Sequence, residues 1–213
     1  MKRTILLGLF FLIFSICNAQ YREQRQDYGY HQHNGFYLSM SLGPTFPNIS
    51  DKLQGIYDYV FTGTGAQFDL KLGGAIRENL ILHATITSNS LVGPTVKSDG
   101  QSVKASNDVT LSESMIGVGL TYYVMPANIF FSGSLGLGNY TIQDTNINTN
   151  SVTTDRGFAM QLKVGREWWV SSRWGLGFAI TYGKTAVHNK VGAGGIEKLD
   201  SNNIGIVFNA SLH

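Results

Sequence analysis

Apolar and polar residues alternate with a period of two along most of the chain beyond residue 34. Between Trp174 and Gly183, large apolar side chains occupy every second position, and glycine, alanine and threonine occupy the positions between them. Strict alternation is typical of β-strands whose two faces meet different surroundings. The pattern predicts eight strands, at residues 35–46, 66–76, 80–88, 114–124, 129–140, 157–170, 174–183 and 202–213.

The connections between these strands alternate in length. Three of them are short, at residues 77–79, 125–128 and 171–173. The other four are long and polar, at residues 47–63, 89–109, 142–155 and 187–199. Outer-membrane barrels have short periplasmic turns and longer extracellular loops. An even number of strands places both ends of the barrel domain on the periplasmic side.

Aromatic residues gather beside the short turns, at one predicted height of the barrel. Tryptophan and tyrosine favour the boundary between lipid and water, because each has an apolar body and a polar tip. The residues predicted to form such an aromatic girdle are Tyr122, Phe131, Trp168 and Trp174. The large-residue face should therefore contact lipid, and the glycine-rich face should line a narrow lumen. The alternative, a soluble barrel of the lipocalin type, would place glycines on the outer wall, where they stabilise strands poorly.

Polar residues on the predicted strands suggest what fills the lumen. The inward-facing group comprises Asp69, Lys71, Gln161, Lys163 and Glu167. A lone charge in a narrow interior is costly, so we expect Asp69 to contact Lys71 or Lys163 and to occlude the lumen. The alternative is a conduction path tuned by these charges. Arg166 faces lipid instead, close to the interface, where a long side chain can reach water.

The first 19 residues have the features of a cleaved signal peptide. Lys2 and Arg3 precede an apolar core, and Cys17-Asn18-Ala19 provides the small residues of a cleavage site after Ala19. A lipoprotein with a lipidated Cys17 is the alternative, but Phe14-Ser15-Ile16 fits poorly the small residues that precede such a cysteine.

Residues 20–34, which follow the signal peptide, are polar and lack periodicity. We expect a flexible periplasmic lead there, in which His31 and His33 are solvated, because two histidines in a flexible segment make a weak metal site. Residues 35–213 then form the barrel domain.

Composition and charge narrow the class of protein further. Charged residues make up only 14% of the chain, and no apolar run outside the amino terminus approaches the roughly 20 residues of a membrane helix. This excludes a helical membrane protein. Cleavage removes two of the 16 basic residues and leaves 14 against 14 acidic ones. The balanced chain lacks the basic face that a nucleic-acid partner requires.

Three segments carry a resemblance to a known family: GFYLSMSLG, GGAIRENLILHATI and VGREWWVSSRWGLGFAITYG. They resemble the small eight-stranded outer-membrane β-barrels of Gram-negative bacteria, which include OmpA-type transmembrane domains, OmpX and OmpW. The resemblance implies an all-β, antiparallel, up-and-down transmembrane barrel in the outer membrane. It also implies contact with outer-membrane lipids, lipopolysaccharide and the barrel-assembly machinery. Many members end on an aromatic residue, whereas this chain ends Ser211-Leu212-His213.

The chemistry of the sequence leaves three functional readings. The first is a monomeric, non-enzymatic barrel, without cofactor or metal, whose four external loops recognise an extracellular ligand. The second is an OmpW-like narrow channel for small or hydrophobic solutes. The third is a lipid-modifying enzyme, which would need a nucleophile, a base and an orienting acid. His83 and Thr85 share a face but lack such a set, and the glycines at 192–195 lack the strand-loop-helix context of a phosphate site.

Overall fold

The computed structural model describes residues 32–53, 56–144, 151–191 and 195–213. The predicted signal peptide and residues 20–31 of the predicted lead lie outside these ranges. Eight long strands form the wall: β1 (Phe36–Leu53), β3 (Gly65–Arg77), β4 (Leu80–Val92), β7 (Val109–Val124), β8 (Ile129–Asp144), β10 (Gly157–Trp169), β11 (Trp174–Val191) and β12 (Gly195–Leu212). Four shorter strands extend it: β2 (Tyr57–Thr62), β5 (Thr95–Ser98), β6 (Gln101–Lys104) and β9 (Val152–Thr153). Among the described residues, no helix is both long and apolar enough to cross a membrane.

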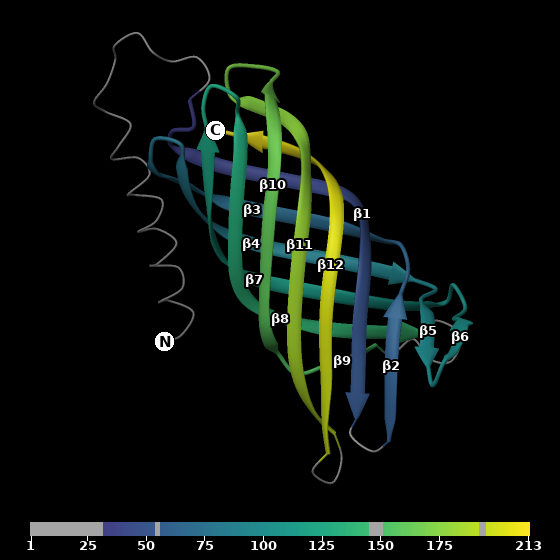
Figure 1. The fold of residues 1–213 in the computed structure, drawn as a ribbon. Coiled ribbons are helices and arrows are strands. Elements are labelled where there is room, and N and C mark those ends of the chain that lie inside the picture. The colour runs from purple at the N-terminus through teal and green to yellow at the C-terminus, as the bar shows by residue number, and fades with distance from the viewer. Residues whose placement is uncertain (1–31, 54–55, 145–150, 192–194) are drawn as a thin grey trace, which may run out of the picture.

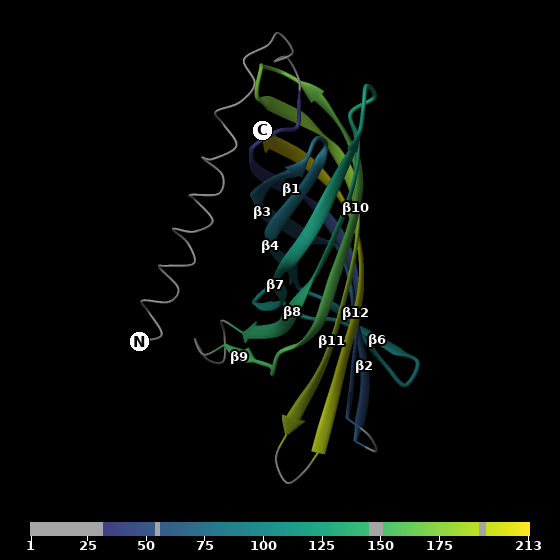
Figure 2. The same ribbon diagram turned by 90° about the vertical axis from the view of Figure 1, so that its left-hand side faces the viewer.

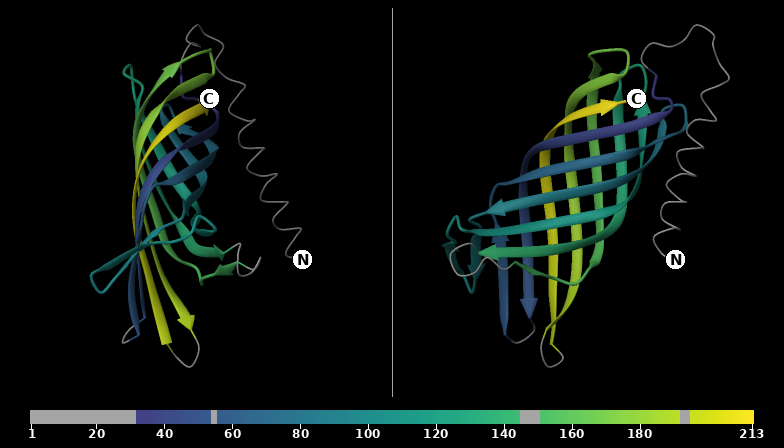
Figure 3. Two further views of the ribbon diagram at one scale, coloured as in Figure 1. Left: turned by 90° about the vertical axis from the view of Figure 1, so that its right-hand side faces the viewer. Right: turned by 180° about the vertical axis from the view of Figure 1, so that it is seen from behind.

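The eight long strands close into a barrel. Each pairs antiparallel with its neighbour in the chain, in the order β12-β11-β10-β8-β7-β4-β3-β1. Pairing of β12 with β1 completes the ring, with Leu38 opposite Leu212 and Phe46 opposite Ile204 (Figure 1). The strands cross the barrel at a tilt (Figure 3), as closure of a small barrel requires. The predicted eight-stranded, antiparallel, up-and-down barrel is confirmed.

The two faces of the wall have opposite character. Leu42, Val118 and Phe178 point outward and are 62%, 65% and 59% exposed. Serine, threonine, asparagine and charged residues at the alternate positions are buried inside. A continuous apolar band around a polar interior is the arrangement expected of a barrel whose outer wall faces lipid. The outer band ends where outward positions become polar, as at Asn48 and Asn202, which lie opposite each other on β1 and β12.

The carboxyl terminus and the short turns share one end of the barrel, termed here the periplasmic end (Figure 1). Asn79 and Asn128 complete two of these turns with φ of 62° and 51°. This left-handed region is tolerated best, after glycine, by asparagine and aspartate. The three short turns occur where the sequence predicts them.

The opposite, extracellular end differs from the sequence-based expectation. The segments predicted as four long loops are mostly strands, because β1, β4, β8, β11 and β12 continue beyond the apolar band. There β2 pairs with β1, β5 pairs with β2, and β6 pairs with β5. Figures 2 and 3 show these extensions splaying apart, with β5 and β6 projecting sideways from the barrel. The prediction of loops is wrong for most of these segments, because apolar alternation fades outside lipid while the backbone pairing continues.

Two buried apolar clusters lie inside the barrel, one towards each end. The periplasmic cluster comprises Tyr37, Ile81, Tyr123, Phe130, Ala179 and Val207. The extracellular cluster comprises Ile49, Leu111, Tyr140, Val187 and Leu199. The central polar residues of the lumen, such as Asp69 and Lys163, therefore lie between two apolar clusters.

Candidate functional site in the barrel lumen

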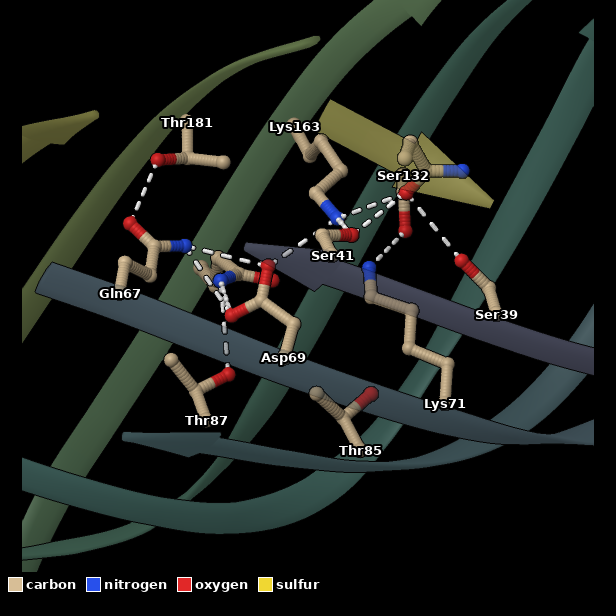
Figure 4. Close-up of polar contacts among 12 residues, drawn as sticks. Ser39, Ser41, Gln67, Asp69, Lys71, Thr85, Thr87, Ser132, Lys163 and Thr181 are labelled. Carbon is tan, nitrogen blue, oxygen red and sulfur yellow. Dashed lines mark hydrogen bonds and ion pairs between the residues drawn. The ribbon is translucent and has the colours of Figure 1, made fainter. Parts of the chain in front are cut away.

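An ion pair lies at the centre of the lumen. Lys163 Nζ on β10 is 3.0 Å from Asp69 Oδ2 on β3, and both side chains are 1% exposed. Gln67 donates to Asp69 Oδ1 over 3.0 Å (Figure 4). Gln161 donates to the same oxygen over 2.9 Å. Asp69 thus accepts from one ammonium and two amides. A buried carboxylate is tolerated when its oxygens are satisfied in this way.

The two inward-facing lysines have different partners. Lys163 Nζ also donates to Ser41 Oγ over 2.5 Å and to Asn209 Oδ1 over 3.2 Å. Lys71 Nζ donates to Ser132 Oγ over 2.6 Å, across the lumen on β8. Of the two lysines that the sequence offers to Asp69, Lys163 forms the ion pair. Ser41 and Asn209 are polar residues of the lumen that carry no charge and were not singled out from the sequence.

Glu167 connects this network to the periplasmic end. Its Oε1 accepts from Asn209 Nδ2 and its Oε2 accepts from Ser211 Oγ, both over 2.6 Å. His213 Nε2 lies 3.8 Å from Glu167 Oε2. Because Asn209 also accepts from Lys163, it bridges the central ion pair and Glu167. The structure therefore joins Asp69, Gln161, Lys163 and Glu167 in one network, with Lys71 bonded to Ser132 beside it.

His83 lies in a second group of polar contacts inside the lumen. Its Nδ1 and Nε2 are 2.9 Å from the hydroxyl oxygens of Thr85 and Thr121. Thr85 in turn contacts Ser134 over 2.9 Å. The imidazole is 2% exposed, so it faces neighbouring hydroxyl groups rather than a surface that a lipid substrate could reach.

A cap closes the periplasmic end and includes part of the predicted lead. His33 is fully buried, and its ring stacks on Tyr123 with 3.6 Å between centroids. It hydrogen-bonds to Asn128 Oδ1 over 2.7 Å and contacts His213 over 3.0 Å. Burial, reinforced by His213, lowers the pKa of His33 to about 3. The expectation of a solvated lead is wrong at His33, because Tyr123 and Asn128 offer it a packed, hydrogen-bonded site.

Two glycines show how tightly the lumen is filled. A Cβ atom on Gly119 would lie 2.5 Å from Ser134 Oγ and 2.7 Å from His83 Cε1. One on Gly205 would lie 2.6 Å from Thr181 Oγ1 and 2.7 Å from the side-chain oxygen of Gln67. The glycines of the inner face therefore make room for the polar side chains that fill the lumen.

The outer surface beside the short turns carries the predicted aromatic residues. Tyr122, Phe131, Trp168 and Trp174 all point outward, with 37–54% of each side chain exposed. Their neighbours Tyr123 and Phe130 point inward instead and belong to the periplasmic cluster. The guanidinium of Arg166 lies over the Trp168 ring, 5.3 Å from its centroid. This cation–π contact holds the charge next to an aromatic residue suited to the membrane interface.

An eight-stranded barrel with an apolar outer band and a polar, filled lumen is a transmembrane barrel of the outer-membrane type. This architecture places the protein in the outer membrane of a Gram-negative bacterium.

No family model matches the chain, and no curated protein matches it. The solved structure of Neisserial surface protein A shares 11% sequence identity with it, with a TM-score of 0.54 over 83% of this chain and 96% of the other. The outer membrane protein OprG from Pseudomonas aeruginosa shares 15% identity, with a TM-score of 0.52 over 88% of this chain and 100% of the other. The suspected resemblance to small outer-membrane barrels is confirmed at the level of the fold.

Proposed function

We propose that this barrel is a closed membrane anchor for an extracellular recognition surface, and that it acts by contact rather than by transport or catalysis. The observation that carries the proposal is the sealed lumen. The buried Asp69–Lys163 ion pair crosses its middle, and an apolar cluster lies towards each end. A filled interior of this kind leaves no continuous path for a solute.

The extracellular extensions have the order needed for a recognition surface. Tyr57 donates to Glu197 over 2.5 Å and so ties β2 to β12. Asn189 on β11 donates to the same carboxylate over 2.8 Å. The Tyr57 and Tyr59 rings stack at 5.0 Å. Paired strands held by such contacts lose less entropy on binding than flexible loops do.

The same region exposes apolar side chains that lipid does not cover. Ile56, Val103, Val152 and Ile196 are 73%, 66%, 71% and 54% exposed, on or beside β2, β6, β9 and β12. Exposed apolar groups outside the lipid-facing band favour contact with another macromolecule. Mixed charges surround them, as in the Lys52–Asp58 ion pair. The lumen does not favour the OmpW-like channel, because its middle is polar and filled.

A trimming experiment tests the proposal. The β5–β6 hairpin, residues 95–104, would be replaced by a short glycine-containing turn, and a Ser172→Ala variant at a periplasmic turn would serve as control. Cells displaying equal amounts of each folded barrel would be tested for attachment to surfaces coated with defined polysaccharides and extracellular proteins. The parent and Ser172→Ala should attach equally, and the trimmed variant several-fold less. Equal attachment by the trimmed variant would contradict a recognition role for this hairpin.

A further inference from the structure

A small chamber lies inside the barrel between the central ion pair and the extracellular apolar cluster. Its lining includes Asn89 on β4, Glu113 on β7, Gln161 on β10 and Asn203 on β12, together with Gln67, Thr87 and Thr185. Their exposed fractions are all 9% or less. The free space inside the chamber is about large enough for one water molecule or one small ion.

The chamber gathers hydrogen-bond acceptors. Asn89 Oδ1, Gln161 Oε1 and Asn203 Oδ1 are buried and have no hydrogen-bond partner. The orientation of two of these amides is fixed by their donor groups: Gln161 Nε2 donates to Asp69, and Asn203 Nδ2 donates to Glu113. A carboxylate accepts hydrogen bonds, so the side-chain nitrogen of each amide faces the carboxylate. The side-chain oxygen of the same amide therefore points away from it. These three buried carbonyl oxygens at one cavity are unsatisfied acceptors, which a hydrogen-bond donor or a cation would satisfy.

Glu113 adds a carboxyl group to these acceptors. It lies opposite Asn89 in the β4–β7 pair and accepts from Ser201 Oγ over 2.8 Å. None of the salt bridges found in the described residues includes Glu113. In the central network, Lys71 and Lys163 offset Asp69 and Glu167. Glu113 therefore has no basic partner among the salt bridges of the described residues.

We propose that this chamber binds one small monovalent metal cation, Na⁺ or K⁺, through the Glu113 carboxylate and the carbonyl oxygens of Asn89, Gln161 and Asn203. Hard cations prefer carboxylate and carbonyl oxygens. A single positive charge neutralises Glu113, whereas a divalent ion would leave an uncompensated charge in a poorly solvated space. The cation would join β4, β7, β10 and β12 and stabilise the closed barrel. The site is internal, so the proposal does not depend on recognition at the extracellular surface.

Cation-dependent stability of the refolded barrel in lipid vesicles tests the site. The urea midpoint would be measured in NaCl, KCl, CaCl₂ and choline chloride at equal ionic strength, because choline is too large for the chamber. Na⁺ or K⁺ should raise the midpoint of the parent above its value in choline chloride, in a saturable way. Glu113→Gln should abolish this difference. Glu78→Gln, which removes an exposed carboxylate at a periplasmic turn, should keep it.

A second variant keeps the test decisive if Glu113→Gln fails to fold. Asn89→Asp places a second carboxylate beside Glu113 and should lower the cation concentration for half-maximal stabilisation about tenfold or shift the preference towards Ca²⁺. A midpoint that is the same in all four salts, for the parent and for Asn89→Asp, would show that water alone satisfies the oxygens and would overturn the proposal. A parent that responds to Ca²⁺ but not to Na⁺ or K⁺ would overturn it as well.

Discussion

At the scale of single residues, the interior of the barrel is a set of charges that depend on one another. Asp69, Lys163 and Asn209 form a chain of contacts that continues to Glu167. Each of these groups has lost its water and gained protein partners, so removal of one leaves another unsatisfied. The stability of the lumen should therefore respond far more to the loss of one partner than a surface ion pair would.

Replacement of Lys163 by methionine tests this dependence. The variant leaves Asp69 with its two amide donors but without its ion-pair partner, and loss of one partner of a buried pair costs about 3–5 kcal/mol. Lys184→Met, on the outer face of β11 above the apolar band, should change the free energy of unfolding by less than about 0.5 kcal/mol. Urea titration of both variants in lipid vesicles checks the prediction. Equal effects would show that water screens the lumen.

The sequence predicts which residues enter the lumen better than it predicts their partners. Alternation alone gives the inward direction of Asp69 and Lys163, because side chains on a strand point to opposite faces in turn. Whether Asp69 meets Lys71 or Lys163 depends on register across strands that are far apart in the chain. Uncharged partners such as Asn209 give no sequence signal beyond their face.

At the scale of elements, each strand passes through two environments. Within the apolar band, outward positions are large and apolar, and above it they are polar or mixed. The sequence therefore locates the membrane-spanning part of β11 and β12 but misses their upper parts, where both faces contact water or protein and alternation weakens. Antiparallel pairing of β11 with β12 nevertheless continues from Trp174–Leu212 to Val191–Gly195.

An arginine scan of the outer face locates the limit of the lipid. Phe178 and Ile196 both point outward, with 59% and 54% exposure, but only Phe178 lies within the apolar band. Phe178→Arg should cost about 2–4 kcal/mol, the penalty for arginine near the bilayer midplane. Ile196→Arg should cost less than about 1 kcal/mol. Refolding titrations into lipid vesicles measure both, and similar penalties would contradict the assigned position of the membrane.

The extracellular end of β1 should be sensitive to pH. Burial, followed by the adjacent Glu197 carboxylate, raises the pKa of Asp51 to about 7. The folded strand end thus retains a proton that the unfolded segment releases between about pH 4 and 7, so local stability falls as pH rises through this window. Hydrogen exchange in β1 and β2, corrected for intrinsic rates, should show more protection at pH 5 than at pH 8. Asp51→Asn should remove the difference, and a parent more protected at pH 8 would contradict the assignment.

At the scale of the whole molecule, the closure of the barrel and its location in the outer membrane were predictable from the sequence. The residues that fill the two ends of the lumen were not. Turn lengths, aromatic positions and alternation together indicate an eight-stranded barrel, because each depends on local sequence. The periplasmic cap depends on His33 meeting Tyr123, Asn128 and His213. The segment around His33 has no periodicity, so nothing local indicates that the residue is buried. The upper chamber likewise exists only when four strands meet around Glu113.

Closure of the lumen is the central claim, and single-channel recording in planar lipid bilayers tests it most directly. The refolded parent should insert without producing a steady conductance, because the Asp69–Lys163 network and the two apolar clusters fill the path. The variant without the β5–β6 hairpin should be equally silent, since that hairpin lies outside the barrel. A steady, ion-selective current through the parent, with a selectivity that changes in Lys163→Met, would contradict the closed-barrel account and establish a channel.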